Sequence, residues 1–291
     1  MNFIDTPLLR IGYEEWNPAG TRTAILLHGW PDSTRCWHAV APALAQRGWR
    51  VLAPALRGFA PTTFLSANTP RAGQLAALSR DLLDFIDALG VHEPVLAGHD
   101  WGARAAAYAC GLRPGVASHL VMMSVGYATN TPDSTIDFDQ ARLYWYHWFM
   151  ATRKGETAVR ADPRGFARTM WDTWAPAGWY SPEEFEATAQ AFDGPDWVDV
   201  TLHSYRHRWG HAPGDAAYAA DEAALTPAPV LPVATLVLHG EADGVNPPAA
   251  SAGKERYFSG RYERRLLPGV GHFPPREAPQ AVAAELLRFL G

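Results

Sequence analysis

Cysteine, lysine and long apolar runs are all scarce in this chain of 291 residues. Cys36 and Cys110 lie far apart and lack the spacing of metal ligands, so we expect two reduced, packed thiols and no disulfide framework. The N-terminus has no basic segment followed by an apolar stretch, and no apolar run approaches the ~18 residues of a membrane span. We therefore expect a cytoplasmic protein that contacts no membrane.

Excess charge of either sign is also missing. The 25 basic and 30 acidic side chains give a formal net charge of −5, which excludes the basic surface of a nucleic-acid-binding protein. With 47% hydrophobic and 19% charged residues, the composition is that of an ordinary globular enzyme. The abundant residue is tryptophan, which occurs 12 times.

Strand-like and helix-like segments alternate along most of the chain. Short β-rich runs end in Gly, Pro or a polar residue, as buried parallel strands do. Between the second and third of them, apolar residues recur every three or four positions from Leu75 to Leu89, which predicts a helix that Gly90 ends. A closing helix is expected after Pro279. The five predicted strands span residues 23–29, 50–56, 94–100, 119–125 and 233–240.

The alternation stops between about Asn130 and Ala228, where helical patterns dominate. Residues 131–222 hold seven of the 12 tryptophans and carry a formal charge of −7. A separate second domain would leave the strand at 233–240 without a sheet to join, so we interpret the segment as an insertion. The prediction is an α/β fold with a mostly parallel central sheet flanked by helices. Its core comprises residues 1–130 and 229–291, and an inserted helical cap comprises residues 131–228.

The most specific motif is Gly-x-nucleophile-x-Gly over residues 98–102, with Asp100 at its centre. It lies where a predicted strand meets the Ala-rich helical stretch 103–110. Small flanking residues permit the strained strand-to-helix turn that lifts a nucleophile above a sheet. An aspartate that merely caps the helix would explain the carboxylate but not the glycines on both sides.

Two further groups follow in the order expected of a catalytic triad. Asp243 comes just after a strand-like run, and His272 lies in a glycine-rich loop before the last helix. The chain order nucleophile, acid, histidine is that of α/β hydrolases. Glu241 is a weaker candidate for the acid.

An oxyanion hole is expected from two backbone N–H groups. One belongs to Trp30, which follows His-Gly at the end of the first central strand. The other belongs to Trp101, the residue after the nucleophile.

Together, His-Gly-Trp-Pro, Gly-His-Asp-Trp-Gly, Gly-Glu-Ala-Asp and Gly-His-Phe resemble the α/β-hydrolase-fold epoxide hydrolases from about Thr23 to the C-terminus. Haloalkane and fluoroacetate dehalogenases are relatives with the same aspartate nucleophile. The resemblance implies an α/β-hydrolase fold and places two tyrosines of the insertion, Tyr146 and Tyr205, as donors to the epoxide oxygen. Tyr144 and His147 compete for the first of these positions.

An aspartate nucleophile restricts the reaction class. Attack on a saturated carbon gives an ordinary ester that water can cleave, whereas attack on an acyl carbon would give a labile anhydride. An epoxide opens to an alkoxide that needs a hydroxyl donor, whereas a halide needs only N–H donors. We therefore expect conversion of a small apolar epoxide and water to a vicinal diol, without cofactor or metal. Trp101, His147 and Trp148 are the predicted substrate-binding residues.

Two alternatives remain open. A haloalkane dehalogenase would use tryptophan indoles for halide, and a non-catalytic binding protein of the same fold would use none of the triad. Three positions depart from family patterns. Trp101 stands where fluoroacetate dehalogenases have the first of two arginines, so that only Arg104 remains. Ser124 lies where some dehalogenases place the acid, and Ala55 replaces an aspartate common in epoxide hydrolases. The sequence indicates no oligomeric state.

Overall fold

The computed structural model describes residues 1–129 and 135–291. Within them, nine strands form one sheet in the order β1-β2-β4-β3-β6-β7-β8-β9, with β5 also paired to β2. Pairs involving β2 are antiparallel, and all pairs from β4 across to β9 are parallel. The strands are β1 (Asn2–Asp5), β2 (Leu9–Trp16), β3 (Arg22–Leu27), β4 (Trp49–Pro54), β5 (Thr63–Phe64), β6 (Val95–His99), β7 (His119–Met123), β8 (Ala234–Gly240) and β9 (Tyr262–Leu267).

All five predicted strands are present, as β3, β4, β6, β7 and β8, and the α/β class is confirmed. Four of them end one or two residues earlier than predicted, because the chain leaves the sheet there to form the loops at its carboxyl edge. β1, β2, β5 and β9 were not predicted. β1 and β9 are edge strands with many exposed positions, so they lack the continuous apolar run that marks a central parallel strand.

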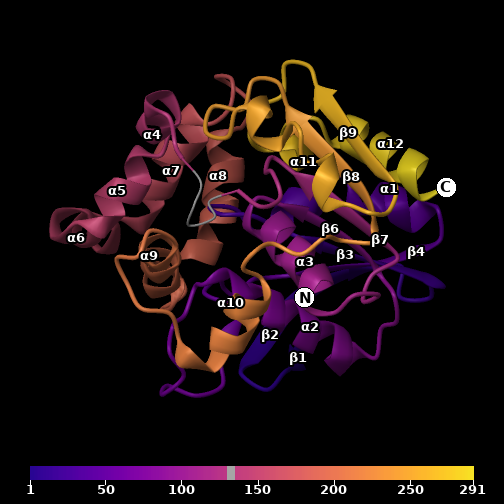
Figure 1. The fold of residues 1–291 in the computed structure, drawn as a ribbon, viewed down its shortest axis with the longest axis horizontal. Coiled ribbons are helices and arrows are strands. Elements are labelled where there is room, and N and C mark those ends of the chain that lie inside the picture. Colours follow the sequence, from indigo (N-terminus) through magenta and orange to yellow (C-terminus); the bar gives the residue numbers. More distant parts are fainter. Residues whose placement is uncertain (130–134) are drawn as a thin grey trace.

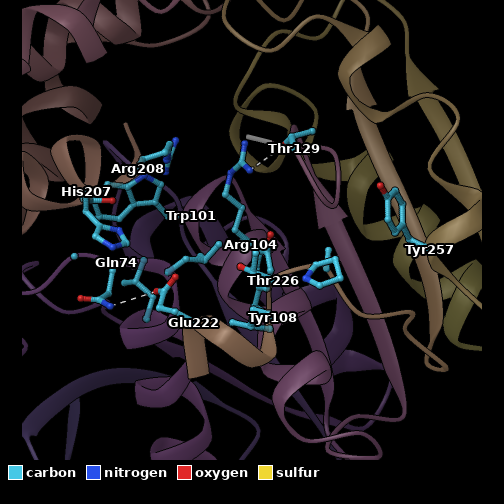
Figure 2. Close-up of a pocket in the computed structure, with 17 residues that line it drawn as sticks. Gln74, Trp101, Arg104, Tyr108, Thr129, His207, Arg208, Glu222, Thr226 and Tyr257 are labelled. Atoms are coloured by element: carbon cyan, nitrogen blue, oxygen red, sulfur yellow. Dashed lines mark hydrogen bonds between the residues drawn. The ribbon is translucent and has the colours of Figure 1, made fainter. Parts of the chain in front are cut away.

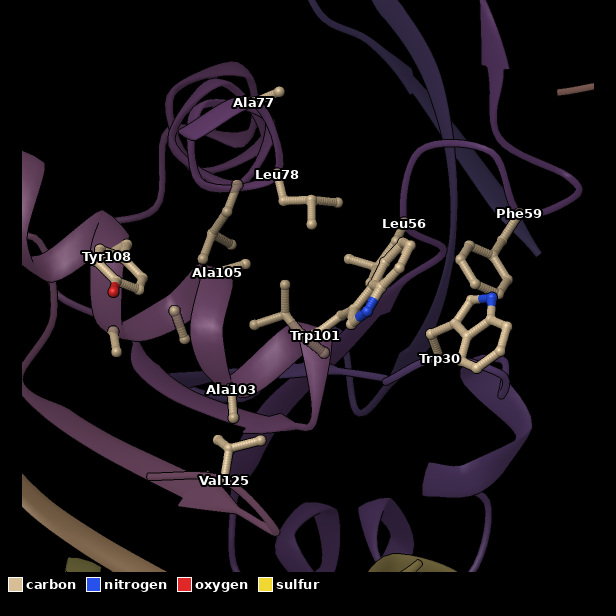
Figure 3. Packing of buried hydrophobic residues seen from close by; sticks show 14 of the residues in the cluster. Trp30, Leu56, Phe59, Ala77, Leu78, Trp101, Ala103, Ala105, Tyr108 and Val125 are labelled. Atoms are coloured by element: carbon tan, nitrogen blue, oxygen red, sulfur yellow. The ribbon is translucent and has the colours of Figure 1, made fainter. Parts of the chain in front are cut away.

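Helices cover both faces of the sheet (Figure 1). Alternate residues of one strand point to opposite faces, so Ile25 and Leu27 pack with α2 and α3 while Ala24 and Leu26 pack with α1 and α12. Figure 3 shows part of the first of these clusters. The helices of the core are α1 (Ala41–Gln46), α2 (Leu75–Leu89), α3 (Trp101–Leu112), α11 (Pro274–Glu277) and α12 (Pro279–Leu290).

The predicted helix over 75–89 is confirmed, and Gly90 ends it in the left-handed conformation with φ 60°. The Ala-rich helix is longer than predicted: α3 begins at Trp101, directly after the motif aspartate. Its start is fixed by the turn described below.

A helical segment connects β7 to β8, which are neighbours in the sheet. The segment spans residues 124–233, and we call its part from residue 135 to residue 233 the insertion. Figure 1 shows its helices α4 to α9 gathered at one side of the molecule, with α10 near α2. Its helices are α4 (Phe138–Leu143), α5 (Trp145–Ala151), α6 (Arg153–Ala161), α7 (Pro163–Thr173), α8 (Pro182–Ala189), α9 (Trp197–Arg208) and α10 (Ala219–Ala224). No helix among the described residues has the length and apolarity needed to cross a membrane.

Short 3-10 helices complete the described secondary structure. They lie in loops and add no layer to the fold. They are η1 (Thr34–Trp37), η2 (Gln190–Phe192), η3 (Ala216–Tyr218), η4 (Pro248–Ser251) and η5 (Glu255–Tyr257).

Candidate active site

Asp100 occupies the single-residue turn between β6 and α3. Its φ of 47° and ψ of −113° lie in a region that a residue with a side chain rarely adopts. Its N–H donates to the carbonyl oxygen of Met123 at 3.1 Å, which ties the turn to β7. Its neighbour His99 donates from Nε2 to the carbonyl oxygen of His272 at 2.6 Å. The strained turn is therefore held from both sides and presents the carboxylate at the carboxyl edge of the sheet.

Three glycines around this turn are required by close backbone approach. A Cβ on Gly98 would lie 2.3 Å from the carbonyl carbon of Gly102, and a Cβ on Gly102 would lie 2.4 Å from the carbonyl oxygen of Leu27. A Cβ on Gly29 would lie 2.6 Å from Cβ of Asp100. Since all three distances are far below van der Waals contact, any larger residue would push the helix away from the sheet.

The three predicted triad members lie together. His272, in the loop between β9 and α11, places Nδ1 2.9 Å from Oδ2 of Asp243 and Nε2 3.8 Å from Oδ2 of Asp100. Nε2 of His272 is buried and has no hydrogen-bond partner within residues 1–129 and 135–291. Burial alone would lower the pKa of His272, but the charge and hydrogen bond of Asp243 outweigh it and raise the pKa above 6.5. The histidine thus has one nitrogen fixed and one directed at the nucleophile.

Asp243 is held as a carboxylate by several donors. Its Oδ1 accepts hydrogen bonds from the N–H groups of Val245 and Asn246 at 2.9 and 2.8 Å. Burial raises its pKa, but His272 and His239 overcome that effect and lower the pKa to about 2. The competing acid, Glu241, is exposed. The geometry therefore favours Asp243 as the partner of the histidine.

The backbone N–H of Trp30 donates to Oδ1 of Asp100 at 3.1 Å. The other predicted donor, the N–H of Trp101, is at the first position of α3, where an α-helix leaves its N–H groups without intrahelical partners. Two N–H groups at these positions can stabilise negative charge that develops on the carboxyl oxygen of the nucleophile. The Trp30 indole is itself fixed by a hydrogen bond from Nε1 to Oγ1 of Thr201 at 3.0 Å.

Tyr146 on α5 and Tyr205 on α9 meet above this turn. Their ring centroids are 5.3 Å apart, and both rings pack on Trp30, at 5.7 Å for Tyr146 and 5.0 Å for Tyr205. Burial, together with negative charge that includes Asp100, raises the pKa of both phenols above 10. Both hydroxyls therefore stay protonated at neutral pH and can donate a proton or hydrogen bond.

The neighbours that competed with Tyr146 have other partners. The hydroxyl of Tyr144 donates to Oδ1 of Asn246 at 2.8 Å. His147 is buried, and its Nδ1 accepts from the indole N–H of Trp209 at 3.0 Å. Burial lowers the pKa of His147 well below 6.5, so it is neutral.

The structure separates the three predicted substrate-binding residues. The Trp101 ring stacks near Trp30 at 6.3 Å, and the His147 ring packs on Tyr205 at 4.6 Å. Trp148 instead packs on Trp209, and its indole N–H donates to the carbonyl oxygen of Ala141 at 2.9 Å. Trp148 thus belongs to the packing of the insertion and makes no ring contact with Trp30 or Tyr205 in the described part of the chain.

Sequence reasoning missed Trp174, which links the insertion to the triad. Its carbonyl oxygen accepts from the N–H groups of His272 and Gly244 at 3.1 and 2.9 Å. Its ring packs 5.0 Å from the ring of His272 and 5.1 Å from that of Tyr146. The insertion contains seven tryptophans, and nothing in the sequence distinguishes Trp174 from the other six.

Among the described residues, no group of three or more His, Cys, Asp or Glu side chains is arranged to hold a metal ion.

Comparison with known proteins gives the family of the chain. The family model described as the alpha/beta hydrolase fold matches residues 24–279. The chain is 26% identical to epoxide hydrolase A of Mycobacterium tuberculosis, covering 99% of this chain and 96% of the relative. An epoxide hydrolase of Caballeronia sordidicola is 27% identical, with 93% and 88% covered.

Solved structures give the same result. A Klebsiella pneumoniae protein, proposed to be an epoxide hydrolase, superposes with a TM-score of 0.93 at 38% identity, covering 99% of this chain and 96% of that one. A Pseudomonas aeruginosa protein, also proposed to be an epoxide hydrolase, superposes with a TM-score of 0.83 at 25% identity, covering 99% and 94%. The chain therefore belongs to the α/β-hydrolase fold family, among the epoxide hydrolases.

Proposed function

We propose that this protein converts an epoxide and water to a vicinal diol through a covalent ester on Asp100. The observation that carries the proposal is the position of Asp100 between two sets of groups. Trp30 N–H and His272 approach its carboxylate, and a pair of protonated phenols lies across the same aromatic cluster. The names of the relatives support epoxides as the substrate class.

In the first step, one oxygen of Asp100 forms a bond to an oxirane carbon as the carbon–oxygen bond of the ring breaks. The electron pair of that bond goes to the ring oxygen, which takes a proton from Tyr146 or Tyr205. The high pKa of both phenols keeps that proton available at neutral pH. The product is a hydroxyalkyl ester of Asp100.

In the second step, His272 removes a proton from a water molecule that attacks the carboxyl carbon of Asp100. The oxyanion forms between the N–H groups of Trp30 and Trp101, and Asp243 stabilises the imidazolium. Collapse of the intermediate breaks the bond between the carboxyl carbon and the ester oxygen, and the leaving alkoxide takes the proton held by His272, which completes the diol. The second proton of the water, now on the carboxyl group of Asp100, returns to the phenolate, and the enzyme is restored.

We further propose that the insertion acts as the cap that encloses the substrate. It supplies both phenols, and the carbonyl oxygen of Trp174 accepts one backbone hydrogen bond from His272 and one from Gly244, next to Asp243. An apolar substrate between the cap and the sheet is screened from bulk water, which strengthens every electrostatic contact in the site.

A second candidate, dehalogenation of an alkyl halide, is favoured by one observation. The indole N–H groups of Trp101 and Trp197 are buried and have no hydrogen-bond partner in the described part of the chain. Such donors could hold a halide ion, which leaves carbon without needing a proton. This candidate gives the phenol pair no role.

One assay separates the candidates. The protein is incubated in parallel with styrene oxide and with 1-bromobutane, and diol and bromide are quantified. Diol without bromide supports epoxide hydrolysis, whereas bromide without diol contradicts it. Failure of broad panels of both substrate types would favour a binding protein without turnover.

A further inference from the structure

The insertion meets the core at more than one place. One is a cavity of about 520 Å³ between α2, α3, α9 and α10, whose described lining includes Trp101 but no member of the triad (Figure 2). Another is the loop after β8 that carries Asp243. We call residues 243–246 of this loop the acid loop, and they are hydrogen-bonded to the insertion. This second contact reaches the triad directly.

The acid loop takes two side-chain hydrogen bonds from the insertion, in addition to the backbone contact at Trp174. Nε2 of Gln140, on α4, donates to the carbonyl oxygen of Val245 at 2.9 Å. The hydroxyl of Tyr144, between α4 and α5, donates to Oδ1 of Asn246 at 2.8 Å. The loop that carries the acid is therefore held by several elements of the insertion.

Asn246 is 5% exposed, and each of its polar atoms has a partner. Its N–H donates to Oδ1 of Asp243 at 2.8 Å, and its carbonyl oxygen accepts from Nε2 of His239 at 2.7 Å. Its Nδ2 donates to the carbonyl oxygen of Ser124, just after β7, at 2.9 Å. Since a carbonyl oxygen can only accept, the amide nitrogen must face Ser124 and the amide oxygen must face Tyr144.

The N–H of Asn246 controls the direction of the Asp243 carboxylate. Oδ1 of Asp243 accepts from Val245 and Asn246, which leaves Oδ2 to face Nδ1 of His272 at 2.9 Å. Nε2 of His239 lies 3.5 Å from the same oxygen. Rotation of the carboxylate away from His272 would break the bonds to Oδ1. A shift of Asn246 would therefore reach the base through Asp243.

Tyr144 and Tyr146 lie two positions apart and have different partners. Burial raises the pKa of Tyr144 above 10, so its hydroxyl stays protonated at neutral pH and can donate to Asn246. Tyr146 instead packs on Trp30, whose N–H donates to the nucleophile. One tyrosine thus belongs to the acid loop and the other to the surroundings of the nucleophile.

We propose that Asn246 is a positioning residue for ester hydrolysis, through which the Tyr144 hydroxyl of the insertion sets the Asp243 carboxylate against the base. Its kinetic role rests on the proposed reaction, whereas the contact itself belongs to the folded protein. The two neighbouring tyrosines then act on different steps, Tyr146 on formation of the ester and Tyr144 on its hydrolysis.

Stopped-flow single turnovers with styrene oxide separate the two steps. Tyr144→Phe keeps the ring and removes only the hydroxyl. It should slow ester hydrolysis about 3- to 10-fold, as expected for loss of one buried hydrogen bond, and change alkylation much less. Tyr146→Phe should show the reverse pattern. Equal slowing of both steps in Tyr144→Phe, or an unchanged hydrolysis rate, would overturn the inference.

A double-mutant cycle tests whether the two residues form one link. Asn246→Ala should slow hydrolysis at least as much as Tyr144→Phe, and combining the two should add nothing further, whereas independent effects would multiply. Tyr180→Phe is the matched control, because its hydroxyl donates to Asp172 within the insertion. It should leave both rates unchanged. If Asn246→Ala does not fold, Tyr144→Phe decides alone.

A spectroscopic measurement makes the inference independent of turnover. The charge and hydrogen bond of Asp243 raise the pKa of His272 above 6.5, so displacement of the carboxylate should lower it. The ring nitrogens of ¹⁵N-labelled histidine report this titration, and the signal of His272 is assigned by its loss in His272→Gln. The other titratable groups that act on the pair, which all the variants keep, are His239, Asp100 and Glu277.

The titration of His272 should move to lower pH in Tyr144→Phe and at least as far in Asn246→Ala, and it should stay in place in Tyr180→Phe. An unchanged titration in Tyr144→Phe would overturn the inference, whatever the protein turns over. A lowered pKa in a protein that forms no ester would support the positioning contact and refute the proposed reaction.

Discussion

Replacing Asp243 with asparagine should slow hydrolysis of the ester and move its pH dependence. The substitution keeps the size of the side chain and removes the charge that raises the pKa of His272. Without that charge, burial dominates, and the pKa of His272 should fall below 6.5. The imidazole then becomes a weaker base and loses the hydrogen bond, 2.9 Å long, that orients it.

The pKa of Asp243 reflects the combined effect of its surroundings, because burial raises it while His272 and His239 lower it by more. A fall from 3.8 to about 2 corresponds to ~2 kcal/mol in favour of the ionised form in the folded state. This contribution to stability is present above the ordinary pKa of 3.8 and is lost as the pH falls through about 2. At neutral pH Asp243 is ionised, so its charge acts on His272. With the orientation of the base also lost, we expect ester hydrolysis to slow at least about 100-fold.

The assay is stopped-flow tryptophan fluorescence with styrene oxide from about pH 5 to pH 9, which spans the titration of histidine. In the unmodified protein the rate of ester hydrolysis should rise with pH, because His272 must be neutral to act as the base. The midpoint of this rising limb of the pH–rate profile should lie above pH 6.5, as the pKa of His272 does. In Asp243→Asn the limb should shift to lower pH, and the alkylation rate should change much less. An unchanged limb together with an unchanged hydrolysis rate would refute the coupling of Asp243 to His272.

Two further variants probe the phenols and the turn. Tyr205→Phe and Tyr146→Phe should each slow alkylation by about 100-fold or less, and the double variant by more, with ester hydrolysis as the internal control. Equal alkylation rates in all variants would remove the phenols from ring opening. Gly102→Ala should lower the free energy of unfolding by ~3 kcal/mol, because its Cβ would lie 2.4 Å from a β3 carbonyl oxygen. Gly194→Ala, with its nearest neighbour at 3.4 Å, is the control in the same urea titration and should cost far less.

The turn at Asp100 could be predicted from sequence because its constraint is local. The close approaches of Gly98 and Gly102 admit no side chain, so the requirement is visible as glycines at fixed spacing. The central strands were predictable for a related reason, since strands buried on both faces must be continuously apolar. Asp243 could be found because it follows such a strand, and His272 because it lies in a glycine-rich loop before the last helix.

Contacts made between distant elements could not be predicted. Trp174 supplies a carbonyl group to His272 through its backbone, and a backbone acceptor leaves no trace in residue type. Trp101 and Tyr205 are over 100 positions apart, and a contact between α3 and α9 brings their ring centroids to 5.7 Å. Tyr146 and Tyr205 could be placed only by resemblance to a family. Trp148 lies on the same helix as Tyr146 but packs on Trp209, and the residue pattern of the helix does not reveal this difference.

The ester on Asp100 is tested most directly by mass spectrometry of His272→Gln after exposure to styrene oxide. Glutamine cannot act as the base, so the second step should fail while the first proceeds. We expect a mass increase equal to one styrene oxide, mapped by peptide sequencing to Asp100 and absent from Asp100→Asn. A variant that binds styrene oxide but carries no adduct, or an adduct on another residue, would contradict it.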